Sequence, residues 1–107
     1  MIRIEFSYDP SGNITGFKMN GHAGYDISGK DIVCSAVSVL ALNTVNSIEE
    51  FCDDDYTISQ DEEEGLLELY IDNDEISDSS ALLLKSLRLG IESVIESYGD
   101  DYVNLVN

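Results

Sequence analysis

The sequence predicts an α+β fold in which two helices cover one face of a mainly antiparallel sheet. Segments of alternating apolar and polar residues come in pairs joined by turn residues, as in β-hairpins. Each pair is followed by a longer segment with apolar residues at helical spacing. The resulting order, ββαββαβ within 107 residues, is typical of a single two-layer domain.

The first hairpin is predicted from residues 2–21. "IRIEFSY" (2–8) places Ile2, Ile4 and Phe6 on one side of a strand and polar residues on the other. "DPSGN" supplies a proline and a glycine for the turn, and "ITGFKMNG" (14–21) returns as the second strand.

A long helix is predicted from about Ile32 to Cys52. Apolar residues recur there at helical spacing, at Val33, Val37, Leu40, Ala41 and Ile48. We expect the helix to start at Asp31, whose carboxylate can cap the first turn, or at Gly29 to Lys30. Cys34 would then lie in or near the first turn.

The second half repeats the pattern. "YTISQ" (56–60) and "LLELYI" (66–71) form a hairpin around the tip "DEEEG", with Leu67, Leu69 and Ile71 on one face. A second helix begins at Ser77 or Asp78 and ends at Gly99, and "YVNLV" (102–106) forms a last strand. The acidic runs 53–55 and 61–64 are interpreted as solvated turns because they lack the spacing of a calcium loop.

The charge balance restricts the possible partners. The chain has 22 acidic and 5 basic residues, a formal charge of −17, which disfavours binding to nucleic acid or to an anionic membrane. It would favour a cationic partner, or serve solubility alone.

Other bulk features indicate a cytoplasmic protein. No apolar run suggests a membrane span of about 20 residues. Cys34 and Cys52 would lie about 27 Å apart along one helix, so they cannot pair with each other, and two thiols suit a reducing compartment. Nothing indicates a metal or an organic cofactor.

Cys34 and His22 are the candidate catalytic pair. A thiol at a helix start is acidified by the helix dipole, and an imidazole beside it can take its proton and pass that proton to a leaving amine. Residue types alone leave open the alternative of a loop histidine near an unreactive cysteine. Cys52, near the other end of the helix on its apolar side, is interpreted as buried and inert.

Several neighbours of this pair could support it. Ser38 is one turn after Cys34, so its hydroxyl could contact the thiol, a substrate or the preceding carbonyl. Asp31 could orient His22 or cap the helix, and Asp26 is a second candidate for the orienting role. The glycines at positions 21, 24 and 29 permit close backbone approach, in a loop that could close over a peptide or simply connect two elements.

"NGHAGYDISGKDIVCSAVS" resembles the ribosomal-processing cysteine protease family Prp, through Gly21-His22-Ala23, Asp31-Ile32-Val33-Cys34 and Ser38. The resemblance implies one cysteine protease domain over residues 1–107 with His22 and Cys34 as its catalytic dyad. It also implies a homodimer, a mobile loop over residues 24–30, and removal of the N-terminal extension of large-subunit ribosomal protein twenty-seven after a pair of aromatic residues.

Two other classes of protein remain open from the sequence. A non-catalytic acidic adaptor would dock a basic ribosomal protein without cutting it. A thiol redox protein is disfavoured because no resolving cysteine lies near Cys34 in the sequence.

Overall fold

The structure, a computed structural model, describes residues 1–21 and 28–107, and for residues 28–31 it describes the backbone alone. The described elements are, in order, β1 (Ile2–Tyr8), β2 (Ile14–Asn20), α1 (Ser28–Phe51), β3 (Tyr56–Asp61), β4 (Leu66–Ile71), α2 (Asp78–Tyr98) and β5 (Val103–Leu105). The predicted order is confirmed, and the strands begin and end within one residue of the predicted bounds.

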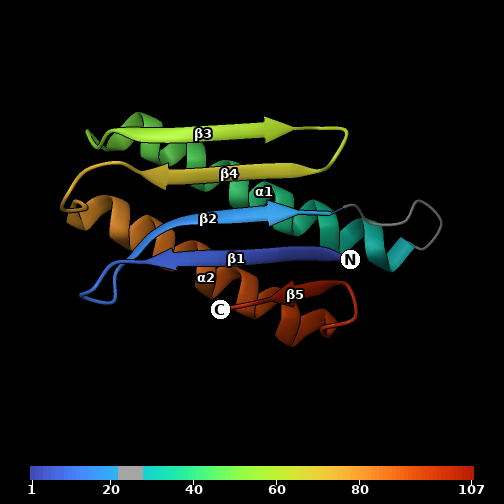
Figure 1. The fold of residues 1–107 in the computed structure, drawn as a ribbon. Helices are drawn as coiled ribbons and strands as arrows, with labels where there is room; N and C mark the ends of the chain where they lie inside the picture. The colour runs from blue at the N-terminus through green and yellow to red at the C-terminus, as the bar shows by residue number, and fades with distance from the viewer. Residues whose placement is uncertain (22–27) are drawn as a thin grey trace.

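The described strands form one sheet in the order β3-β4-β2-β1-β5. β5 pairs with β1 in parallel, and the other neighbours are antiparallel. Both helices lie behind the sheet, on the same face of it (Figure 1). The predicted α+β class, with two helices on one face of a mainly antiparallel sheet, is therefore confirmed.

The hydrophobic core lies between the sheet and the helices. Alternation along β1 turns Ile2, Ile4 and Phe6 toward the helices, and all three are buried. The inward sides of the helices supply Val33, Val37, Ala41, Val45, Ile48, Leu84, Leu87 and Ile91. Since burial of one large aliphatic side chain stabilises a fold by about 1.5–3 kcal/mol, these contacts fix the position of α1 on the sheet.

α1 begins earlier than the sequence predicts, at Ser28. The predicted mobile loop ran to Lys30, but residues 28–30, Gly29 included, form the first turn of the helix. Glycine in a helix costs only about 1 kcal/mol relative to alanine, which a helix of 24 residues packed on a sheet tolerates. Cys34 consequently lies in the second turn.

α1 also corrects the prediction about apolar runs. Its segment Ile32–Phe51 has a mean hydropathy of 1.4 and is long enough to cross a bilayer by composition and length alone. The core helix of a soluble protein meets the same criteria, so this composition is weak evidence for a membrane span. Here one side of α1 packs on the sheet.

Asp54 corrects the interpretation of residues 53–55 as a solvated run. Its side chain is buried, and it accepts hydrogen bonds from the Ser80 hydroxyl at 2.7 Å, from the Ser77 amide at 3.0 Å and from the Ser77 hydroxyl. Ser77 is the N-cap of α2, as predicted, and accepts from the Ser80 amide. The carboxylate thus ties the end of α1 to the beginning of α2.

Candidate active site

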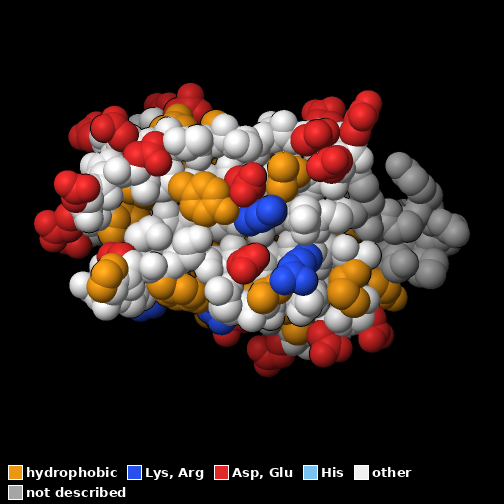
Figure 2. Space-filling view, in the orientation of Figure 1, with side chains coloured by type: hydrophobic (Ala, Val, Ile, Leu, Met, Phe, Trp, Pro, Cys, Tyr) orange, Lys and Arg blue, Asp and Glu red, His pale blue; other side chains and the backbone are white. Residues whose placement is uncertain are grey.

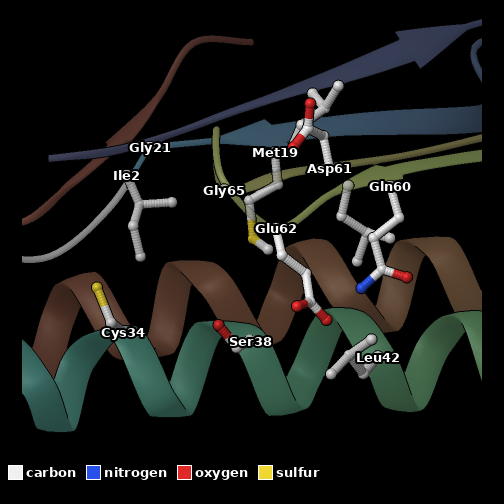
Figure 3. Close-up of a pocket in the computed structure, with 12 residues that line it drawn as sticks. Ile2, Met19, Gly21, Cys34, Ser38, Leu42, Gln60, Asp61, Glu62 and Gly65 are labelled. Carbon is white, nitrogen blue, oxygen red and sulfur yellow. The ribbon is translucent and has the colours of Figure 1, made fainter.

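A cavity of about 260 Å³ opens between α1 and one end of the sheet. Its lining comes from the beginning of β1, the end of β2, one side of α1 and the β3–β4 hairpin (Figure 3). The lining residues are Ile2, Met19, Gly21, Cys34, Ser38, Leu42, Gln60, Asp61, Glu62, Gly65, Leu66 and Leu67.

The buried pairs of the sheet end next to this cavity. Met19 pairs with Leu67, which pairs with Gln60, and the first two fill the helix-facing side of the sheet with buried side chains. Gly21 follows the end of β2, Gly65 precedes the start of β4, and both line the cavity.

Gly21 is required at its position by geometry. Its φ is +110°, which side chains of L-residues rarely adopt. A Cβ atom there would lie 2.3 Å from the Met1 carbonyl oxygen. The glycine therefore lets the end of β2 pass close to the start of β1, immediately before residue 22.

Cys34 faces the cavity from α1. The side chains at Cys34, Ser38 and Leu42, each one helical turn from the next, lie along the side of α1 that faces the cavity (Figure 3). Cys34 is half-buried and packs against the core, so its sulfur lies between the core and the cavity. The predicted proximity of Cys34 and Ser38 is confirmed.

The helix start contributes less to Cys34 than the sequence suggests. The dipole effect falls off within the first turn, and Cys34 is in the second. Backbone amides at this depth donate to carbonyls one turn earlier in the helix, so they are not available to a substrate.

The remaining predicted site residues lie partly outside the described structure. His22, Gly24 and Asp26 are outside the described residues. Asp31 is described only as a backbone position in the first turn of α1, so its role as cap or as partner of His22 stays a prediction.

Cys52 lies away from this site. It follows the last residue of α1, its amide donates to the Ile48 carbonyl at 3.1 Å, and it packs half-buried against the core. It is less buried than predicted. The cavity lining includes Cys34 and not Cys52, which makes Cys52 a natural control for the chemistry of Cys34.

The hairpin tip, residues 61–65, contributes lining residues that the sequence interpretation missed. Asp61, Glu62 and Gly65 border the cavity, and Glu62 reaches toward Ser38 and Leu42 (Figure 3). The sequence carried no clear signal for this, because Glu62 lies in the turn after β3, where the alternation of a strand no longer applies.

The cavity is bordered by a cysteine at the end of a two-layer α+β domain, an arrangement that permits thiol chemistry. Comparison with known families identifies the class as cysteine protease. The family model described as cysteine protease Prp matches residues 1–104. The chain belongs to this family.

One relative by sequence and two solved structures support the same assignment. A ribosomal processing cysteine protease Prp of Staphylococcus aureus is 26% identical over 101 residues, which cover 94% of each chain. A crystal structure of the S. aureus protease Prp with a substrate peptide has a TM-score of 0.87 at 25% identity, covering 98% of this chain and 97% of the other. A second, with a covalently linked product peptide, has a TM-score of 0.85 at 26% identity and the same coverage.

Proposed function

We propose that this protein is an endopeptidase that removes the N-terminal extension of large-subunit ribosomal protein twenty-seven, with Cys34 as nucleophile and His22 as base. The observation that carries the proposal is the position of Cys34, whose side chain borders a cavity at the sheet end. The names of the S. aureus relatives, which describe ribosomal processing and peptide complexes, support the substrate class.

The reaction follows the chemistry of a thiol and an imidazole. His22 takes the Sγ proton of Cys34, and the thiolate attacks the scissile carbonyl carbon. The C–N bond breaks as the imidazolium gives its proton to the leaving amine, which leaves a thioester on Cys34. Water, deprotonated by His22, then hydrolyses the thioester and restores the thiol.

The oxyanion formed in this reaction needs hydrogen-bond donors. The amides of α1 around Cys34 are engaged within the helix, so donors have to come from other groups around the cavity. The Ser38 hydroxyl borders the cavity one turn from Cys34 and can donate to the oxyanion or to the substrate backbone.

The charge and surface of the protein fit the remaining parts of the proposal. A charge of −17 attracts a basic ribosomal precursor and repels RNA. We infer a cytoplasmic homodimer, in line with the family resemblance. Large aliphatic side chains exposed on the helices, at Ile32, Val39, Leu82 and Leu89, are suited to a protein interface.

The test is mass spectrometry of a peptide that covers the extension and its junction, after incubation with the protein under reducing conditions. Wild type and Cys52→Ala should each make the same single cut, and Cys34→Ala should make none. Cleavage by Cys34→Ala would refute the assignment of the nucleophile. A peptide that binds wild type and stays intact would indicate the adaptor instead.

A further inference from the structure

We propose that Glu62 determines specificity for a lysine or arginine side chain of the substrate, two to four residues from the scissile bond. This inference rests on the proposed protease function and adds a recognition site to it.

The tip of the β3–β4 hairpin carries Glu62 to the cavity. β3 ends at Asp61, which pairs with Leu66, and Glu62 is the first residue of the turn that follows. The Gly65 amide donates to the Glu62 carbonyl at 3.3 Å, which closes the turn. Figure 3 shows the Glu62 carboxylate pointing at α1, between Ser38 and Leu42, and Glu62 lines the cavity with both of them.

The space between Cys34 and Glu62 is open for a substrate. Gly21 and Gly65 both line the cavity and, as glycines, place no side-chain atoms in it. An extended peptide passing over Cys34 can therefore continue along α1 toward Glu62.

The spacing along α1 gives the position of the recognised residue. Ser38 and Leu42 are one and two turns beyond Cys34, about 6 and 12 Å along the helix axis. An extended peptide advances about 3.3 Å per residue. The Glu62 carboxylate, above Ser38 and Leu42, thus lies opposite a substrate residue two to four positions from the bond at Cys34.

The charges around the cavity favour a cationic side chain. Asp61 and Glu62 are the charged residues in its described lining. The ion pair found among the described side chains joins Arg88 to Glu92 on α2. No described lysine or arginine pairs with Glu62. Arg3 and Lys18 border a separate hollow with Glu5 on the outer face of the sheet, where Figure 2 shows the basic side chains amid a largely acidic rim.

The apolar neighbours of Glu62 suit the stem of such a side chain. Leu42 and Leu66 line the same cavity. Lysine and arginine bury their methylene stems on apolar surface while the charged group reaches a polar partner. A lysine or arginine that contacts Leu42 with its stem could bring its charge to the Glu62 carboxylate.

The experiment compares kcat/KM for pairs of synthetic junction peptides at low salt. Within each pair, one position two to four residues from the cut, on either side, carries lysine in one peptide and acetyl-lysine in the other. Wild type should prefer lysine at one of these positions by about 1.5- to fivefold, the range of an exposed ion pair. Glu62→Gln should reduce this ratio to about one, and Glu62→Lys should favour acetyl-lysine.

Glu64→Gln is the matched control. It removes the same charge from the same exposed hairpin tip, at a residue outside the cavity lining. It should keep the wild-type ratio. An equal fall of the ratio in Glu64→Gln and Glu62→Gln would overturn the inference in favour of long-range attraction.

Two further outcomes separate this inference from the function on which it rests. Cleavage of both peptides of every pair at the same rate by wild type would overturn the role of Glu62 and leave the protease assignment standing. Failure of wild type to cleave any peptide would overturn both.

Discussion

Replacement of Asp54 by alanine should destabilise the protein more than any other change of a single acidic residue in its loops. Asp54 accepts hydrogen bonds from the Ser77 amide, the Ser77 hydroxyl and the Ser80 hydroxyl. It therefore holds the N-cap of α2 and the turn from which β3 runs toward the cavity.

The structure sets the magnitude of this loss. Ser80 is 0% exposed, so without Asp54 its hydroxyl is left without that acceptor in the core, at a cost of about 1–3 kcal/mol. Weakening of the Ser77 cap adds about 1 kcal/mol. We expect a total of about 2–4 kcal/mol, against a stability of about 5–15 kcal/mol for a domain of this kind.

The assay is urea unfolding followed by circular dichroism, with Asp53→Ala as control. Asp53 is exposed and carries the same charge, so its replacement should change the free energy of unfolding by less than about 0.5 kcal/mol. Addition of Ser80→Ala to Asp54→Ala should cost less than the sum of the single changes. Equal stability of Asp54→Ala and Asp53→Ala would refute the reasoning.

The effect should also depend on pH. Burial of Asp54 opposes its ionisation, but the hydrogen bonds from Ser77 and Ser80 outweigh burial and lower its pKa below the ordinary 3.8. A carboxyl whose pKa is lower in the folded state stabilises the fold above the unfolded value and loses this contribution as pH falls through the folded value. The stability difference between wild type and Asp54→Asn should thus be largest above about pH 4 and shrink below it.

Two substitutions and one labelling experiment test the site and the contact between the helices. Gly21→Ala should lower the free energy of unfolding by about 1–3 kcal/mol in urea titrations, because its φ of +110° and the Met1 carbonyl oppose a Cβ atom; unchanged stability would contradict this. Gly90→Val should cost about 1–3 kcal/mol by the same assay, since a Cβ at Gly90 already lies 3.0 Å from Leu40, and a gain in stability would show that Leu40 yields freely. Iodoacetamide near neutral pH should label Cys34 faster than Cys52, as peptide mapping can measure, and equal rates would argue against an activated thiol.

Most of the fold could be predicted because its signals are local. Alternation defines β1, and Ser77 and Gly99 mark the ends of α2 where predicted. Partners distant in sequence gave no such signal. The interpretation of Asp54 as solvated was wrong because its partners lie more than twenty residues away, and the pairing of β5 with β1 follows from the packed fold.

The site was predicted in part for the same reason. Helical spacing was enough to place Cys34 and Ser38 on one side of α1. The earlier start of α1 was missed because Gly29 suggests a break. Glu62 was missed because a charged turn is usually solvated, and its position at the cavity is set only by the folded hairpin tip.

The contact between Gly21 and Met1 places the amino terminus beside the cavity. A Cβ at residue 21 would lie only 2.3 Å from the Met1 carbonyl oxygen, and Ile2 lines the cavity itself. Residues added before Met1, such as a purification tag, would therefore emerge next to the proposed nucleophile and could compete with a substrate peptide for the cavity. The carboxyl terminus is held near the other end of β1, where the Asn107 side chain accepts from the Phe6 amide at 2.9 Å (Figure 1). Fusions for activity measurements belong at that end of the chain.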